Sequence, residues 1–70
     1  MNGFGERLVC LRKAAGLTQQ QVADALHLHR TTYTKYECDV AEPSLEAVCH
    51  LSELFSLSVD ELLKPNEPSE

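Results

Sequence analysis

Apolar residues at the start of the chain recur with the period of a helix. Phe4, Leu8, Leu11 and Ala15 follow one another at intervals of four, three and four residues, so they share one helix face. Gly16 comes next and can take the left-handed conformation that ends many helices. The pattern therefore predicts a first helix that begins near Phe4 and stops before Gly16.

The next stretch predicts two shorter helices. Thr18 and Gln21 have the spacing of a capping box, which marks the start of a second helix. After a break over residues 27–29, Tyr33 and Tyr36 stand three residues apart in a polar segment, 30–37, that suits a third helix. The inward positions of the second helix are Val22, Ala23 and Leu26, and its outward positions are Gln19, Gln20 and Asp24.

Two further helices follow a loop that ends at Pro43. Residues 38–42 form that loop, and Ser44 is the N-cap of a fourth helix. Ser58 and Glu61 predict a second capping box for a final short helix that ends at residues 62–63. The inward positions of the fourth helix are Leu45, Val48, Leu51 and Phe55, and its outward positions are Glu46, His50 and Glu53.

These elements predict a compact all-α bundle of five helices in one domain, residues 1–63, with no convincing strand. Residues 64–70 contain two prolines and are expected to form a short, acidic, flexible tail. A chain of 70 residues buries only about 60% of its unfolded surface, so we expect modest stability. The expected core comprises Phe4, Leu8, Leu11, Val22, Ala23, Leu26, Leu28, Tyr33, Leu45, Val48, Leu51, Phe55, Leu57, Val59 and Leu62.

The charges are unevenly distributed along the chain. Six Lys and Arg residues against eleven Asp and Glu residues give a net charge of −5 at pH 7, which at first argues against a nucleic-acid partner. Residues 1–37, however, hold five of the six cations and only three acids, for a local charge of +2. The remainder holds eight acids and Lys64 alone, for −7. An anionic partner is therefore expected to meet the first half of the chain.

The sequence also argues against several classes of protein. No apolar run approaches the roughly 18 residues of a membrane span. The first residues lack the basic and apolar regions of a signal peptide, so we expect a cytoplasmic protein with no membrane partner. Neither a Gly-rich phosphate loop nor a catalytic constellation is recognisable, so neither an enzyme nor a cofactor is expected.

The cysteines and histidines do not have the spacing of a metal site. With no recognised zinc-ligand spacing, free thiols and no bound metal are expected, and redox sensing through Cys38 is the alternative. The residues concerned are Cys10, Cys38, Cys49, His27, His29 and His50.

The order of the elements, a helix, a capped helix, a short break and a polar helix, is that of a helix-turn-helix. The residues that strengthen this match are Leu11-Arg12, Ala15-Gly16-Leu17-Thr18-Gln19, Val22-Ala23, residues 30–37 (RTTYTKYE), Pro43-Ser44-Leu45-Glu46 and residues 54–63 (LFSLSVDELL). Together they resemble the lambda-repressor-like, Cro/XRE-type helix-turn-helix family from about Phe4 to Leu63. The resemblance implies a DNA-binding domain whose helix at residues 30–37 enters the major groove.

The resemblance also implies roles for individual residues. Phosphate contacts are expected from Gln19 and Arg12, and more weakly from Thr32 and Tyr36, whereas Tyr33 is assigned to the core. The helix at residues 30–37 presents its solvent side to the bases, where Arg and Lys can donate to guanine and Thr can hydrogen-bond or place a methyl group on thymine. The expected base contacts are Arg30, Thr31, Thr34 and Lys35.

Arg12 and Glu37 correspond in the family to a salt-bridged pair that ties the first helix to the DNA-reading helix. Such a pair would fix the angle at which residues 30–37 are presented. The alternative is a pair of ordinary surface charges, worth about 0–1 kcal/mol.

The sequence departs from the family pattern at three places that usually carry glycine. His27 lies between the two helices of the motif, Cys38-Asp39 follows the reading helix, and Ser56 precedes the last helix. Such glycines normally have a positive φ, which costs a residue with a Cβ roughly 1 kcal/mol. His29 also replaces the common Ser or Thr cap of the reading helix, and residues 39–42 carry no cation, so modest DNA affinity per subunit is expected.

The sequence thus predicts a transcriptional regulator, in the first instance a repressor, that binds a double-stranded DNA operator as a homodimer. The last two helices, with Leu54, Leu57 and Leu63, are the expected dimer surface. Two alternatives stay open. The first is an antitoxin or protein-interaction module whose acidic second half binds a protein partner, and the second is a DNA-binding fragment of a larger regulator.

Overall fold

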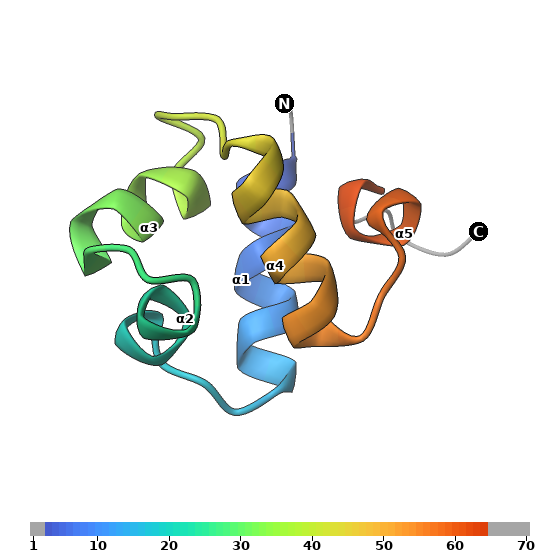
Figure 1. The fold of residues 1–70 in the computed structure, drawn as a ribbon, viewed down its shortest axis with the longest axis horizontal. Coiled ribbons are helices and arrows are strands. Elements are labelled where there is room, and N and C mark those ends of the chain that lie inside the picture. The colour runs from blue at the N-terminus through green and yellow to red at the C-terminus, as the bar shows by residue number, and fades with distance from the viewer. Residues whose placement is uncertain (1–2, 65–70) are drawn as a thin grey trace.

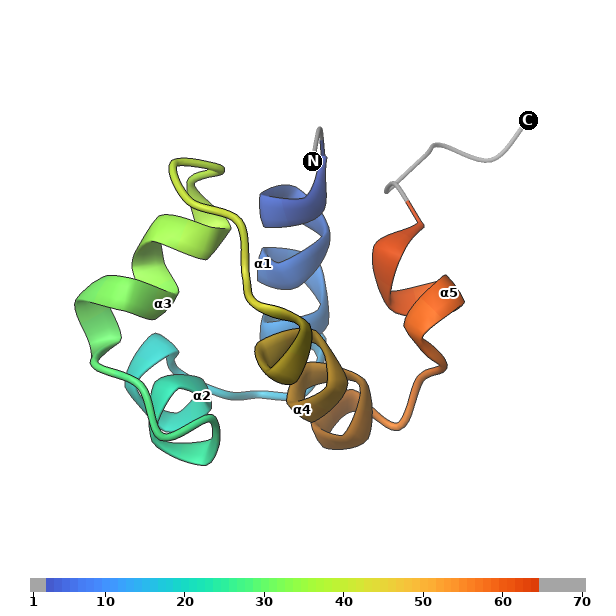
Figure 2. The ribbon, with the colours of Figure 1, turned by 45° about the horizontal axis from the view of Figure 1, so that its top comes forward.

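Five helices make up the computed structural model, which describes residues 3–64: α1 (Phe4–Ala14), α2 (Gln19–Ala25), α3 (Arg30–Glu37), α4 (Leu45–Phe55) and α5 (Val59–Leu63). α1 and α4 lie at the centre, with α2 and α3 on one side and α5 on the other (Figure 1). A second view shows the same separation of α5 from the α2–α3 pair (Figure 2). The predicted all-helical fold of five helices is confirmed, and the tail predicted for residues 64–70 lies, apart from Lys64, outside the described residues.

Local capping chemistry sets where the helices begin. The Thr18 hydroxyl accepts a hydrogen bond from the Gln21 backbone N–H at 3.1 Å, and the Gln21 side chain accepts one from the Thr18 backbone N–H at 2.8 Å. This is the complete capping box that the sequence predicts. Ser44 and Ser58 likewise each accept a bond from the backbone N–H three residues later, at 3.1 Å, which at Ser58 is one half of the predicted box. The His29 side chain makes no capping bond to α3.

Three turns place a residue other than glycine in the left-handed region. His27, Asp39 and Ser56 have φ angles of 59°, 58° and 56°. These residues lie in the turn between α2 and α3, just after α3, and at the end of α4. All three are among the positions where the family pattern has glycine, so the expected backbone conformation is confirmed, and a side chain there is strained.

The core draws on all five helices and differs from the expected set at several residues, among them Leu57, which was expected inside but does not belong to the core cluster. Leu45 and Val59 were expected inside, but they are 78% and 36% exposed. Tyr36 and Ala47 were not expected inside, and both are buried. The buried apolar residues are Phe4, Leu8, Val22, Ala23, Leu26, Tyr33, Tyr36, Ala47, Val48, Leu51 and Leu62, with Leu11, Leu17, Leu28, Ala41, Leu54 and Phe55 packed against them.

The exposure of Leu45 follows from the angle at which α4 is packed. The buried stripe of this helix passes through Ala47, Val48 and Leu51, with Leu54 and Phe55 partly buried beside it. That stripe is rotated away from the first residue of the helix, so the Leu45 side chain lies on the solvent side. The helical spacing of Leu45 from Val48 fits either orientation, because the sequence does not say which part of an apolar face meets the neighbouring helices.

Candidate nucleic-acid interface

α2 and α3 pack against each other, and α3 also packs against α1 (Figure 1). This arrangement leaves one side of α3 open to solvent. Arg30, Thr31 and Lys35 are exposed there, and Thr34 is half-buried. Arg30 and Thr34, like Thr31 and Lys35, are four residues apart, so each pair lies along one line of the helix surface. The structure therefore brings the four residues predicted to contact bases onto one side of α3, which we call the reading surface after the role that the sequence predicts for it.

An ion pair ties α3 to α1. Arg12 Nε donates to Glu37 Oε2 at 2.6 Å, and a second guanidinium nitrogen, Nη2, donates to Oε1 at 3.3 Å. The third nitrogen, Nη1, donates to the Leu17 carbonyl at 3.1 Å, in the connection between α1 and α2. Only 13% of the Arg12 side chain and 4% of the Glu37 side chain are exposed. The pair is therefore a bidentate, largely buried contact rather than two surface charges.

Gln19 extends this contact to α2. Its side-chain N–H donates to Glu37 Oε1 at 2.8 Å, and its carbonyl oxygen accepts the hydroxyl proton of Thr34 at 3.0 Å. The four residues Arg12, Glu37, Gln19 and Thr34 form what we call the polar network, which links α1, α2 and α3. Because a primary amide has two N–H donors and the network uses one, Gln19 retains a donor for an outside acceptor.

The polar network controls the ionisation of its members. Burial alone would raise the pKa of the Glu37 carboxyl. Hydrogen bonds donated by Arg12 and Gln19 lower it, and so does the nearby dipole of the Tyr33 hydroxyl, so this pKa lies below its ordinary value. The carboxylate in turn raises the pKa of Arg12. Burial, reinforced by the Glu37 charge, raises the pKa of Tyr33 well above its usual range. The Tyr33 hydroxyl is buried without a well-formed hydrogen bond to any described residue, so the carboxylate acts on it through its charge.

Two of the expected phosphate contacts have little surface to offer. Tyr36 is only 7% exposed and packs edge-to-face on Tyr33, with ring centroids 6.3 Å apart and an interplanar angle of 81°. The ring of Tyr36 is therefore part of the core, and a phosphate contact from its hydroxyl stays a prediction. Arg12 already donates to three protein oxygens. Thr32 and Gln19 are half-buried and remain accessible.

A second contact, between α1 and the turn that follows α3, was not anticipated from the sequence. The Asp39 carboxylate accepts a hydrogen bond from the Gly5 backbone N–H at 3.1 Å. A Cβ on Gly5 would overlap the Glu37 carbonyl, so α1 approaches the end of α3 at a place where only glycine fits. Two features of the sequence could have indicated this contact: Gly5 lies near the start of an amphipathic helix, and Asp39 stands where the family has glycine.

The cations are less concentrated at the reading surface than the count along the chain suggests. Arg12 is neutralised by Glu37. Arg7 donates to the Glu61 carbonyl at 3.0 Å and so faces α5, on the other side of the fold. The exposed cations of α3 are Arg30 and Lys35. This distribution strengthens the expectation of modest affinity per subunit for an anionic partner.

Other site types find little support in residues 3–64. No three His, Cys, Asp or Glu side chains in that range come together as a metal site. All three cysteines are exposed and outside any disulfide. Of the helices in the same range, none combines the length and apolar character needed to cross a bilayer.

The model of a protein family described as helix-turn-helix matches residues 11–62 of the chain. The chain belongs to the helix-turn-helix family. The resemblance to the Cro/XRE-type family is thereby confirmed, and the fold agrees: the crystal structure of a transcriptional regulator from Listeria innocua superposes with a TM-score of 0.83. The two chains are 31% identical, and the match covers 96% of this helix-turn-helix chain and 63% of the Listeria chain.

Curated relatives of this helix-turn-helix chain are named as regulators rather than as enzymes. An uncharacterized HTH-type transcriptional regulator, YonR, derived from the SPbeta prophage of Bacillus subtilis, is 46% identical over 61 residues, which cover 87% of this chain and 56% of YonR. The HTH-type transcriptional activator BcrR of Enterococcus faecalis is 39% identical over 91% of this chain and 31% of its own length. The cryptic phage CTXphi transcriptional repressor RstR of Vibrio cholerae is 39% identical over 81% of this chain and 51% of its own. The chain thus spans about half the length, or less, of these relatives.

Proposed function

We propose that this chain is a sequence-specific DNA-binding domain that regulates transcription by reading the major groove with α3. The observation that carries the proposal is the attachment of α3 to α1 and α2 by the polar network, with Arg30, Thr31 and Lys35 exposed on its outer side. A reading helix must be held at a defined angle, and its side chains must be free to meet base edges. The names of the relatives as transcriptional regulators support the same function.

The side chains of the reading surface and of Gln19 contact different parts of the DNA in this proposal. Arg30 and Lys35 donate to guanine O6 and N7, and Thr31 offers a hydroxyl or a methyl group. The Thr34 hydroxyl proton is already given to Gln19, so Thr34 offers DNA its lone pairs or its methyl group. Gln19 donates its second amide N–H to a phosphate, and Thr32 is a further, weaker phosphate contact. DNA binding of this kind would place the protein in the cytoplasm, on the nucleoid when bound.

We propose a homodimer formed through the corner between α4 and α5. A hollow of about 300 Å³ there is lined by Leu54, Phe55 and Leu57, with Leu11 and Ala14 of α1 and the following Ala15 opposite. Leu63 is 37% exposed. Apolar surface of this kind is suited to a second copy, and two-fold symmetry would set two α3 helices about 34 Å apart in successive major grooves. Repression by occupying a promoter is the simplest mode for such a dimer.

Selection of bound duplexes from a random DNA pool at low salt tests the proposal. We expect an enriched motif with two half-sites one helical turn apart, and affinity that falls steeply as salt rises. Sedimentation of the protein–DNA complex would count two copies per duplex. The double variant Arg30→Ala/Lys35→Ala, with the polar network left intact, is expected to abolish enrichment. No enriched motif for the unaltered chain would refute DNA reading, whereas a single half-site bound by one copy would refute only the dimer.

A second candidate function is protein binding by the acidic part of the chain, as in an antitoxin or an interaction module. Residues 39–63 include six acidic residues and no Lys or Arg. This segment includes α4 and α5, which lie away from the reading surface of α3 (Figure 2). The two functions can coexist, because they use different residues.

A further inference from the structure

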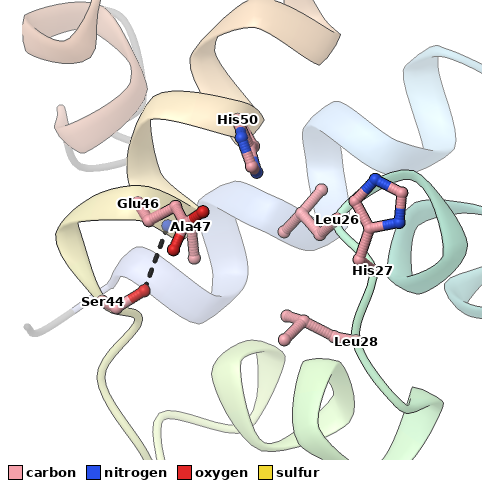
Figure 3. A pocket seen from close by; sticks show the side chains of 7 residues that line it. All are labelled: Leu26, His27, Leu28, Ser44, Glu46, Ala47 and His50. Atoms are coloured by element: carbon pink, nitrogen blue, oxygen red, sulfur yellow. Dashed lines mark hydrogen bonds between the residues drawn. The ribbon is translucent and has the colours of Figure 1, made fainter.

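A groove runs along α4 on the side that faces the turn between α2 and α3. Its first part is a hollow of about 190 Å³ in which Leu26 and Leu28 face Ala47 and His50 (Figure 3). The neighbouring hollow, of about 360 Å³, is lined by Ala25, Glu53 and Leu54 as well as by His27 and His50. His27 and His50 line both hollows, so the two are parts of one depression, which we call the α4 groove.

The wall that α4 contributes has the spacing of a helix-binding surface. Glu46, Ala47, His50, Glu53 and Leu54 recur at intervals of one, three, three and one residues, so they form a single stripe. From Ala47 to Leu54 the stripe extends by about 10 Å, or two helical turns. Two turns of a partner helix laid along this stripe could place apolar side chains on the leucines of the groove.

The charge of the α4 groove is one-sided. Glu46 and Glu53 stand two turns apart on its α4 wall and are both exposed, and the residues that line the two hollows include no Lys or Arg. The surrounding chain is anionic as well, with six acids and no Lys or Arg from Asp39 to Leu63. A complementary partner therefore carries Lys or Arg on both sides of an apolar stripe.

We propose that the α4 groove is a docking site for a basic amphipathic helix of another protein. The leucines and Ala47 receive the apolar stripe of that helix, and Glu46 and Glu53 pair with its cations. None of the predicted base-contact or phosphate-contact residues lines the groove, so docking leaves the reading surface of α3 uncovered. The site would allow a second protein to join the DNA-bound regulator, and it does not depend on DNA binding being correct.

A second copy of the chain is a poor occupant for this groove. Its acidic segment would bring carboxylates against Glu46 and Glu53. Among the described helices, α3 is the one that could offer a second copy's groove two exposed cations and no exposed acid. If α3 were seated in the groove, however, it could not bind DNA. Charge complementarity therefore favours a partner with a different sequence.

The test uses a synthetic helical peptide of fourteen residues, with leucines on one face and lysines on both flanks, and a control peptide with glutamate in place of lysine. Both are titrated into the unaltered chain and followed by amide chemical shifts. We expect the lysine peptide alone to bind and to shift the amides of Ala47, His50 and Leu54. In Glu46→Gln/Glu53→Gln, its affinity is expected to fall by about fivefold or more at low salt, since two ion pairs are lost.

A matched variant distinguishes the effect of the groove carboxylates on peptide affinity from the effect of net charge alone. Glu6→Gln/Asp60→Asn removes the same number of carboxylates from exposed first-turn positions outside the groove, and should change peptide affinity by less than about twofold. Equal weakening in both variants, shifts confined to other helices, or no binding of the lysine peptide would overturn the proposal. So would shifts at Ala47 and His50 produced simply by concentrating the chain, because they would assign the groove to a second copy; Leu54 is left out of this comparison because it also lines the corner proposed for the homodimer. DNA affinity of the groove variant, measured separately, is expected to stay within about twofold of the unaltered chain, so that failure of docking and failure of DNA reading are told apart.

Discussion

The carboxylate of Asp39, just beyond the end of α3, accepts a hydrogen bond from the backbone N–H of Gly5 in the first turn of α1. The residue at the N-cap of α1, Gly3, makes no side-chain capping bond, so Asp39 supplies one from 34 positions away. Together with the pair formed by Arg12 and Glu37, this bond attaches the last part of α3 to α1 at two places. The reading surface is therefore braced against the first helix.

Removing the Asp39 cap should destabilise the domain. Asp39→Ala loses the acceptor while keeping a Cβ at positive φ, and we expect the free energy of unfolding to fall by about 1–2 kcal/mol. Asp39→Asn keeps an acceptor oxygen and a residue type that tolerates this conformation, so its loss should be about half as large. Urea unfolding followed by circular dichroism measures both. Equal stability of the Ala variant and the unaltered chain would show that the bond contributes nothing.

The Arg12–Glu37 pair should show strong energetic coupling. Each single variant, Arg12→Met or Glu37→Gln, leaves part of the polar network unpaired in a nearly buried site, so each should cost about 2–3 kcal/mol. The double variant leaves no unpaired charge and should cost at least about 1 kcal/mol less than the two single losses combined. A double-mutant cycle from urea unfolding gives this coupling directly. Additive losses would mean that the pair behaves as two separate surface charges.

Stability should fall in acid through Glu37. Its carboxyl has a lowered pKa in the folded chain, so the unfolded chain takes up a proton first as the pH drops. The stabilisation is complete above the unfolded pKa of about 4.3 and is lost as the pH falls from there through the lower folded pKa. Below about pH 4.3 the free energy of unfolding should therefore decline more steeply for the unaltered chain than for Glu37→Gln. Parallel curves for the two proteins, measured by urea unfolding at several pH values, would contradict this assignment.

Glycine should improve two of the three turns with positive φ. His27→Gly and Ser56→Gly relieve a strained backbone, and each is expected to raise the free energy of unfolding by about 0.5–1 kcal/mol. Asp39→Gly relieves the same strain but also removes the bond to Gly5, so no net gain is expected there. Thermal and urea unfolding of the three variants compare them directly. A gain at position 39 equal to that at position 56 would show that the side chain of Asp39 does not stabilise α1.

Arg30 and Lys13 should affect DNA binding in different ways. Arg30→Ala is expected to weaken binding to the selected site by about 1–3 kcal/mol and to relax preference at one base pair. Lys13 is also exposed, but it lies on α1 rather than on the reading surface. Lys13→Ala should therefore weaken all duplexes slightly and equally. Binding curves on the selected site and on single-base variants of it distinguish the two patterns, and a uniform loss for Arg30→Ala would exclude direct base contact.

Short-range features of this protein could be predicted from the sequence. The Thr18–Gln21 box and the Ser44 cap were predictable because a capping bond joins residues within one helical turn. The positive φ of His27 and Ser56 was predictable because the family pattern requires a left-handed residue at each turn. The exposure of Arg30 and Lys35 followed in the same way, since the polar side of a short amphipathic helix faces water.

The angles at which the helices pack decided what the sequence left open. They placed Leu45 in solvent, although the spacing of apolar residues had put it on the inward face, and they buried the Tyr36 ring beside Tyr33. They also brought Gln19 within hydrogen-bond distance of Glu37, 18 residues away, and Gly5 within reach of Asp39. Such contacts join residues from different helices, so their formation depends on the packing of the whole bundle. Helix starts and turns therefore depend on residues close together in the sequence. The polar network and the bond between Asp39 and Gly5 form only once the five helices are packed.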